Sequence, residues 1–340
     1  MTRVSEAQAQ DLVTRIFCQV GVRPDMANDA AAMLTMTEMM GIRTHGLARV
    51  SNYVDRIKAG GVNPNATPLI TTPAPALRII DGQNALGAAV TLQATKAAME
   101  AARGVGIGAA FCRGSSHLGA LAPHLYLAAQ AGFAAIITTN SAPMIAPAGG
   151  RDAVIGNAPF GLAVPDPNGA HVILDIALSV AARSKVRQAS EADLAIPETW
   201  ATDANGHPTT DAKAAMSGLM QAIGGAKGAN LALCLDLFAG GLSGAAMLSE
   251  IPNANLRPDA VANVGHMIVL IDAGCLLSQD TLASRMSDVR NLIENGRRVD
   301  LSVAIRMPGA RAIAALHKAQ GEGFDIAPAL LAELEGMVAG

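Results

Sequence analysis

Residues 41–50 gather side chains suited to proton transfer and anion binding. Their sequence is Gly-Ile-Arg-Thr-His-Gly-Leu-Ala-Arg-Val, so the hydroxyl of Thr44, the imidazole of His45 and the guanidinium of Arg49 lie close together along the chain. Imidazole changes its charge near neutral pH, and a guanidinium pairs with a carboxylate through two hydrogen bonds. We therefore interpret this stretch as a candidate acid–base centre beside an anion site. The competing interpretation is a histidine with a purely structural role.

A second histidine follows a predicted strand. The apolar run 106–112 leads into Arg-Gly-Ser-Ser-His-Leu-Gly at residues 113–119, which places His117 where sites of α/β proteins commonly form. His117 is therefore a second acid–base candidate. The alternative is that Ser115 or Ser116 caps the following helix and His117 contributes to that cap.

Two later strands also end in polar residues. Asn140 and Ser141 follow the run 134–138, and Asp175 closes the run 170–176. Asp175 either caps the following helix or accepts hydrogen bonds from a ribose. Polar residues after several strands predict a binding site at the strand ends.

Two glycine clusters suggest nucleotide binding with different strength. Gly104, Gly106 and Gly108 follow a predicted helix and precede a strand, the reverse of the dinucleotide-binding order, so we interpret them as a turn. The sequence Gly-Gly-Ala-Lys-Gly at 224–228 leads into a helix, where backbone N–H groups and Lys227 suit a phosphate or a carboxylate. That pattern lacks the Walker spacing and is weak by itself.

Composition excludes several classes of protein. Apolar residues make up 51% of the 340 and charged residues 16%, which indicates a folded protein with much buried surface and makes an oligomer a reasonable expectation. A net charge of −3 and 3% aromatic residues give no platform for nucleic acid, and no apolar stretch is long enough for a membrane span.

The four cysteines lie far apart, so we expect reduced thiols in a cytoplasmic protein. Neither a metal-ligand spacing nor a GxSxG hydrolase elbow is present.

The hydrophobic periodicity predicts helices at both ends of the chain and an α/β region between them. Three N-terminal helices are expected at 5–20, 24–40 and 47–57, and His45 and Arg49 should share one face of the third. Residues 62–75, rich in Pro, Thr and Asn, are predicted to be a connector. Strands are expected at 77–82, 106–112, 134–138, 170–176 and 267–271, alternating with helices, and C-terminal helices at 279–295, 310–320 and 327–338.

Taken together and in order, the motifs resemble those of the malate/L-lactate/L-sulfolactate dehydrogenase family, which also holds ureidoglycolate dehydrogenase, diketogulonate reductase and piperideine-2-carboxylate reductase. The resemblance covers nearly the whole chain. The motifs that carry it are Gly41-x-x-Thr44-His45-Gly46-x-x-Arg49-Val50, Gly60-Gly61-x-Asn63-Pro64, Asp81-Gly82, Ser116-His117-x-Gly119, Thr139-Asn140-Ser141, Pro147-x-Gly149-Gly150, Asp175, Pro197-x-x-Trp200, Asp203-x-x-Gly206-x-Pro208-Thr209-Thr210-Asp211, Gly224-Gly225-x-Lys227-Gly228, Gly265-His266 and Pro308-Gly309.

The resemblance implies a fold and an assembly. It implies an α/β protein with a non-Rossmann cofactor domain, built on a mixed, largely antiparallel sheet at residues 75–275. A helical domain would form from both chain ends, residues 1–74 and 276–340. The family further implies a homodimer with active sites near the subunit interface.

The resemblance also assigns roles to residues. The catalytic residues that the resemblance implies are His45 as proton donor, Thr44 beside it, Arg49, which would bind the substrate carboxylate, and His117 as the second acid–base candidate. NAD or NADP would be bound by Asn140, Ser141, Asp175, Ile176, Ala177, Gly225, Lys227, Gly228, Pro308 and Gly309.

We therefore expect an NAD(P)-dependent enzyme that interconverts a small 2-oxo acid and its L-2-hydroxy acid. The chain departs from the family pattern at three places: Asn157-Ala158 where relatives have Thr-Asn, Ser184 in place of a glycine, and Ala226 and Ala229 around Lys227. The first of these loops is expected to border the substrate, so malate or lactate is not transferred to this chain as its substrate. Two alternatives stay open, a cyclic-imine reductase using the same residues and a catalytically silent relative that binds nucleotide.

Overall fold

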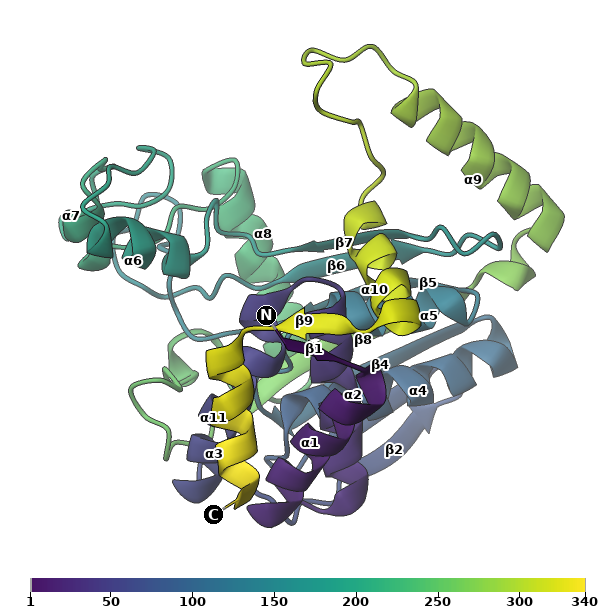
Figure 1. Ribbon diagram of the computed structural model, residues 1–340, viewed down its shortest axis with the longest axis horizontal. Coiled ribbons are helices and arrows are strands. Elements are labelled where there is room, and N and C mark those ends of the chain that lie inside the picture. The colour runs from purple at the N-terminus through teal and green to yellow at the C-terminus, as the bar shows by residue number, and fades with distance from the viewer. Residues whose placement is uncertain (1, 340) are drawn as a thin grey trace.

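The computed structural model of the chain describes residues 2–339 and shows a mixed α/β fold (Figure 1). Among these residues no helix is both long and apolar enough to cross a membrane. The helices are α1 (Glu6–Gln19), α2 (Pro24–Met39), α3 (Val50–Lys58), α4 (Gly87–Val105), α5 (Ala122–Gln130), α6 (Arg183–Glu191), α7 (Ala212–Met216), α8 (Ala226–Asp236), α9 (Gln279–Glu294), α10 (Ala310–Glu322) and α11 (Pro328–Ala339). The strands are β1 (Thr2–Val4), β2 (Leu69–Ala74), β3 (Leu77–Asp81), β4 (Ile107–Ser115), β5 (Phe133–Thr139), β6 (Phe160–Val164), β7 (Val172–Ile176), β8 (Val264–Asp272) and β9 (Phe324–Ile326).

A seven-stranded sheet in the order β2-β3-β4-β8-β5-β6-β7 forms the centre of the molecule. Strands β3 and β4 pair in parallel, and the other neighbours run antiparallel, which confirms the expected mixed, largely antiparallel sheet. Since β4 and β5 both run opposite to the strand β8 between them, they run parallel to each other, and β7 shares their direction. The polar residues that follow β4, β5 and β7 therefore lie on the same side of the sheet, at the carboxyl ends of these strands.

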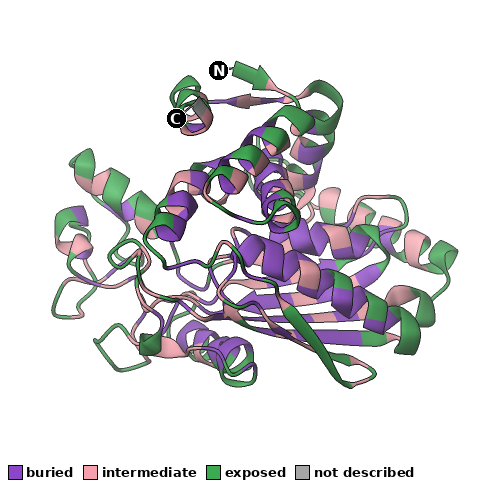
Figure 2. Cartoon of the chain, turned by 90° about the horizontal axis from the view of Figure 1, so that it is seen from below, coloured by how far each residue is buried: buried purple, intermediate pink, exposed green. Residues whose placement is uncertain are grey.

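Helices cover this sheet and create the main core. Helix α4 packs on β3, β4 and β8, α5 packs on β5, β6 and β7, and α2 lies against both helices. Burial is concentrated where these layers meet (Figure 2). The two chain ends meet as well, because β1 pairs antiparallel with β9 and α1 packs against α11. The domain borders after residues 74 and 275 stay predictions.

Local sequence signals explain several element ends. Ser5 Oγ accepts a hydrogen bond from Gln8 N, and the Gln8 side chain accepts one from Ser5 N, which forms a capping box at the start of α1. Gly106 ends α4 in the left-handed region, at φ +84°, directly before β4. The glycine cluster at 104–108 is thus the helix-to-strand turn that its context predicted.

Three predictions of local structure are wrong. Residues 62–75 are not all connector, because residues 69–74 form β2 at the sheet edge, where a mostly exposed strand tolerates threonine and proline. The strand β6, which begins at Phe160, was not among the strands expected from the sequence. His45 and Arg49 do not share a face of α3. They belong to two short 3-10 turns, residues 43–45 and 47–49, that precede it.

Helix α9 and the loop after it form an arm, residues 276–305, that extends away from the rest of the molecule (Figure 1). Arg290 anchors the arm by donating to Asp166 Oδ2 at 2.7 Å and to the carbonyl of Ala170 at 2.6 Å. Large apolar side chains are nevertheless exposed along it: Leu276, Leu277, Val289, Leu292, Ile293, Val299, Leu301 and Val303.

Candidate active site

The buried carboxylate of Glu38 fixes the two 3-10 turns that precede α3. Glu38 Oε2 accepts a hydrogen bond from Leu47 N at 3.0 Å, and a Cβ on Gly46 would lie 2.5 Å from the same oxygen. Arg49 Nε then donates to the carbonyl of Thr44 at 2.7 Å, which folds the second turn back onto the first. These contacts bring Arg49 to Thr44 and His45 without a shared helix face. Sequence reasoning missed Glu38.

The structure brings the two candidate histidines together. His117 follows β4, and its ring lies parallel to that of His45 within 30°, with 5.7 Å between the ring centroids. The hydroxyl of Thr44 lies 2.9 Å from His45 Nδ1. The four residues predicted to be catalytic, Thr44, His45, Arg49 and His117, therefore form one cluster.

Tyr53 joins this cluster, although no role was predicted for it from the sequence. Its hydroxyl lies 2.7 Å from His117 Nδ1, and its side chain is 3% exposed. The sequence signal that could have found it was its position four residues after Arg49, which on a helix sets two side chains one turn apart.

Burial and nearby cations keep both histidines neutral. Burial, followed by the charge of Arg49, lowers the pKa of His45 to about 4. Burial and then Arg49 also hold the pKa of His117 well below its ordinary value. Arg56 adds a buried positive charge. Its guanidinium donates to the carbonyls of Gly61 and Ala260 and pairs with no carboxylate in the described chain. The cluster therefore combines neutral imidazoles with positive charge, which suits an anionic substrate.

Ser116 and Asp175 each cap a helix, but neither caps the helix that the sequence predicted. Ser116 Oγ accepts from Gly87 N at 2.9 Å and donates to the carbonyl of Ala85, so it caps α4 rather than the following α5. Asp175 Oδ2 accepts from Ala122 N at 2.9 Å and caps α5, which precedes it in the chain. Burial raises the pKa of Asp175. This cap ties the end of β7 to the loop that carries His117.

Asn140 and Ser141, predicted to contact the cofactor, make protein contacts. The Asn140 side chain is buried, donates to the carbonyl of Ala246 at 2.7 Å and accepts from Gly265 N at 2.9 Å. Ser141 Oγ donates to Asn157 Oδ1 at 3.0 Å. His266 is buried between Ser115 and Thr139, with its ring nitrogens 2.7 and 2.8 Å from their hydroxyl oxygens.

The remaining predicted cofactor residues gather around β7. Ile173 N donates to the carbonyl of Pro308 at 3.1 Å, which places the turn at Pro308 and Gly309 on this strand. Just beyond Asp175, Ile176 and Ala177, the carbonyl of Leu178 accepts from Ile223 N at 2.9 Å, next to the glycine turn at 224–228. Two segments distant in sequence thus lie along β7, the Pro308 turn near its start and the glycine turn beyond its end.

The glycine turn fits an anionic group. Gly224 and Gly225 have φ values of +60° and +61°, and a Cβ on either would meet no atom within 4 Å. They lead into α8, whose first turn has no side-chain cap within residues 2–339, and Lys227 beside it is exposed. A Cβ on Gly228 would collide with the carbonyl oxygen of Ile223, so glycine is required there. Free N–H groups and an ammonium are the donors that a pyrophosphate requires.

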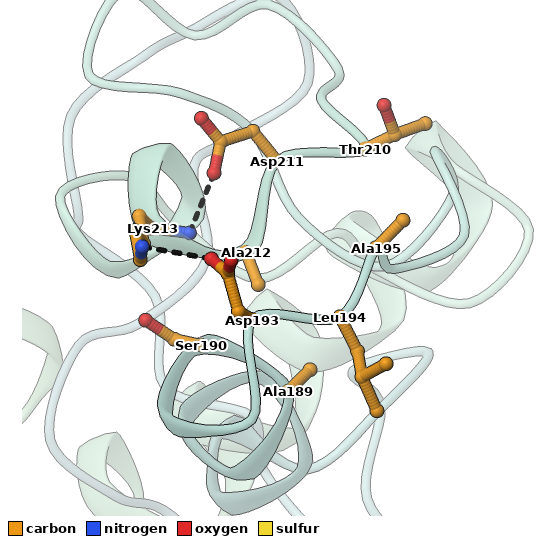
Figure 3. Close-up of a pocket in the computed structure, with 9 residues that line it drawn as sticks. All are labelled: Ala189, Ser190, Asp193, Leu194, Ala195, Thr210, Asp211, Ala212 and Lys213. Carbon is orange, nitrogen blue, oxygen red and sulfur yellow. Dashed lines mark hydrogen bonds and ion pairs between the residues drawn. The ribbon is translucent and has the colours of Figure 1, made fainter.

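Two cavities lie outside the histidine cluster. One, of about 170 Å³, adjoins Gly225 and α8. The other, of about 290 Å³, lies between α6 and α7 and contains an ion pair of Lys213 with Asp193 at 2.8 Å (Figure 3). It is lined by none of the predicted site residues. Across residues 2–339, no three His, Cys, Asp or Glu side chains are arranged to hold a metal ion.

A family model described as malate/L-lactate dehydrogenase matches residues 4–335. The chain belongs to this family. Malate/L-lactate dehydrogenase family members are oxidoreductases, which agrees with the resemblance found from the motifs.

Relatives within the malate/L-lactate dehydrogenase family carry several substrate names. The chain is 31% identical to malate dehydrogenase of Pyrococcus abyssi, over 87% of this chain and 83% of that protein. It is 30% identical to (2R)-3-sulfolactate dehydrogenase (NADP(+)) of Chromohalobacter salexigens, over 97% and 96%. Two others are ureidoglycolate dehydrogenase (NAD(+)) of Escherichia coli, 29% identical over 84% and 81%, and Delta(1)-pyrroline-2-carboxylate reductase of Ancylobacter novellus, 28% identical over 98% and 97%. The structure of sulfolactate dehydrogenase from Methanocaldococcus jannaschii superposes with a TM-score of 0.90 at 26% identity, covering 99% of this chain and 97% of that one.

Proposed function

We propose that the protein is a cytoplasmic NAD- or NADP-dependent oxidoreductase that interconverts a small 2-oxo acid and its L-2-hydroxy acid. The observation that carries this proposal is the pair of neutral, stacked imidazoles of His45 and His117 beside the Arg49 guanidinium. An arginine suits the carboxylate of such an acid, and an imidazole suits the proton exchanged at the neighbouring oxygen.

The protein residues supply binding and proton transfer. Arg49 holds the substrate carboxylate, and His45 exchanges a proton with the oxygen on the adjacent carbon. A bound nicotinamide supplies or accepts the hydride. The cluster is half-buried: Tyr53 is buried, and His45, Arg49 and His117 are partly exposed. Partial exclusion of water strengthens the electrostatic interactions around the reacting atoms.

The cofactor is proposed to bind without a Rossmann fingerprint. The glycine turn with Lys227 would hold its phosphates, and Asp175 to Ala177 with the turn at Pro308 and Gly309 would border the remainder. Asn140 and Ser141 would contact it through main-chain carbonyl oxygens, because both side chains and the N–H of Asn140 are engaged within the protein. Relatives named for NAD+ and for NADP+ support a nicotinamide cofactor of either kind.

We further propose that the protein is a homodimer in which the arm packs on a second copy of the chain. Leu292 and Leu301 on the arm are 76% and 83% exposed, and a second copy would bury them. Light scattering is expected to show a dimer for the natural chain and a monomer for the double variant Leu292→Asp, Leu301→Asp. Leu256→Asp, at an equally exposed leucine outside the arm, should remain dimeric. A natural chain that is monomeric would contradict the assembly.

A cyclic-imine reductase is the second candidate function. A cyclic imine carrying a carboxylate would meet Arg49 and His45 in the same way, with the imine nitrogen in place of the keto oxygen. The relative named Delta(1)-pyrroline-2-carboxylate reductase, aligned over 98% of this chain, favours this candidate. The third alternative, a catalytically silent protein that binds nucleotide, predicts cofactor binding without turnover of any substrate.

The test combines cofactor binding with turnover. The protein is titrated with NADH and with NADPH while cofactor fluorescence is followed, and then 2-oxo acids and cyclic imines are added while absorbance is recorded. Binding and oxidation of cofactor with a 2-oxo acid supports the leading proposal, and turnover with cyclic imines alone supports the second candidate. Binding without turnover indicates the silent protein, and absence of binding refutes an NAD(P)-dependent enzyme.

Replacement of Arg49 by alanine is expected to raise the KM for the acid substrate about 100-fold, with a much smaller effect on kcat, because a charge-assisted bidentate contact to the carboxylate is lost. Steady-state kinetics at saturating cofactor measure both constants. Arg43→Ala is the matched control, since Arg43 is exposed and its Nε lies 3.9 Å from Glu38 Oε1. An unchanged KM in Arg49→Ala would show that the carboxylate binds elsewhere.

A further inference from the structure

Two hydrogen-bonding groups converge on one nitrogen of His117. The Tyr53 hydroxyl lies 2.7 Å from Nδ1, and Gly119 N donates to the same Nδ1 at 3.3 Å. A hydroxyl can donate or accept, but a backbone N–H can only donate. Nδ1 is therefore an acceptor, and a neutral His117 ring carries its proton on Nε2.

His45 is held differently. Its Nδ1 faces the Thr44 hydroxyl at 2.9 Å, and this partner can turn to serve either a protonated or an unprotonated nitrogen. His45 can thus gain and lose a proton without losing its contact. His117 cannot take up a proton at Nδ1 without opposing the N–H of Gly119.

We propose that Tyr53 is a positioning residue which, with the N–H of Gly119, holds neutral His117 as the Nε2–H tautomer. In this arrangement, which rests on the proposed function, His117 donates a hydrogen bond to the reacting oxygen and His45 alone transfers the proton. In the oxidation direction the substrate O–H bond breaks and its proton passes to His45. A bound oxidised nicotinamide would accept the hydride from the carbon as the carbonyl forms, and His117 keeps its proton.

The surroundings support this division of roles. Burial, Arg49 and then His45 lower the pKa of His117, so its ring is neutral and the choice of tautomer matters. Burial raises the pKa of Tyr53, which keeps its hydroxyl protonated and able to donate to Nδ1. A neutral imidazole that donates a hydrogen bond polarises a carbonyl without exchanging its own proton.

The tautomer can be observed without substrate. The full chain is labelled with 15N-histidine, and the His117 signals are assigned by their absence in His117→Asn. At pH 7 the natural protein is expected to show a protonated Nε2 and an unprotonated Nδ1. In Tyr53→Phe the shifts of the two nitrogens should move toward each other, because Gly119 alone holds the tautomer. A protonated Nδ1 in the natural protein would overturn the proposal, whether or not the enzyme turns over.

Kinetics then test the role of Tyr53. In Tyr53→Phe, kcat is expected to fall about 10- to 100-fold, the effect of one hydrogen bond of about 1.4 to 2.8 kcal/mol, with the substrate KM within about twofold. Tyr126→Phe is the matched control, because it removes another tyrosine–histidine contact, 3.2 Å to His317 Nε2, outside the cluster. Unchanged kcat and an unchanged His117 tautomer in Tyr53→Phe would refute the positioning role.

Discussion

The His45→Ala variant is expected to lose about 10²- to 10⁴-fold in kcat, the usual contribution of a general acid–base residue, while its affinity for cofactor stays unchanged. The loss follows because His45 is the imidazole whose contact, the Thr44 hydroxyl, accommodates both protonation states. Steady-state turnover measures kcat, and fluorescence titration with NADH or NADPH measures cofactor affinity. His207→Ala is the control, because His207 is exposed and lies outside the cluster.

The pH profile gives a second readout for His45. Oxidation requires His45 to be neutral, and its pKa is lowered to about 4 by burial and Arg49. The kcat/KM for oxidation should therefore stay level as the pH is lowered from 7 to about 5, and fall as His45 becomes protonated below that. A limb near pH 6.5 would show an imidazole with an ordinary pKa. Normal kcat in His45→Ala would assign proton transfer to His117.

Replacement of Gly265 by alanine is expected to destabilise the fold by about 3 to 5 kcal/mol, or to prevent folding. A Cβ at this position would collide with the carbonyl oxygen of Ala239 and lie 2.7 Å from its carbon, which are backbone atoms of the π-helical turn Leu237–Gly241. Relief requires that this turn separate from β8, which would also disturb the hydrogen bond from Gly265 N to Asn140.

Chemical denaturation followed by circular dichroism measures this loss, and an insoluble product is the extreme form of the same result. Gly104→Ala is the control, because Gly104 lies in α4, where an added Cβ would meet no atom within 4 Å, and this variant should gain about 0.5 to 1 kcal/mol. Equal stability of Gly265→Ala and the natural chain would mean that β8 and the π-helical turn separate at little cost.

Local patterns predicted those parts of the fold that local interactions determine. The capping box at Ser5, the left-handed Gly106 and the apolar strands all follow from neighbouring residues. The edge strand β2 was missed because its pairing with β3, rather than its own composition, makes it a strand. Residues 43–49 resemble a helix start in sequence, but buried Glu38 holds them as separate turns.

The site was predicted in its residue types and only partly in its contacts. Thr44, His45, Arg49 and His117 converge as expected, because β4 ends beside the turns before α3. Asp175 was expected to cap the following helix as one option, but the helix it caps begins 53 residues earlier, which no sequence spacing signals. Tyr53 was missed since an aromatic at an apolar helix position predicts core packing unless its hydroxyl partner is known.

The pairing of β1 with β9 has a consequence for how the chain folds. This ribbon joins Thr2 to Ile326, so it closes a loop that contains nearly the whole chain. The entropy lost on closing a loop grows only slowly with its length, yet contacts of such large sequence separation form slowly. We therefore expect the central sheet and its covering helices to assemble first, and the ribbon between the chain ends to form among the last steps of folding.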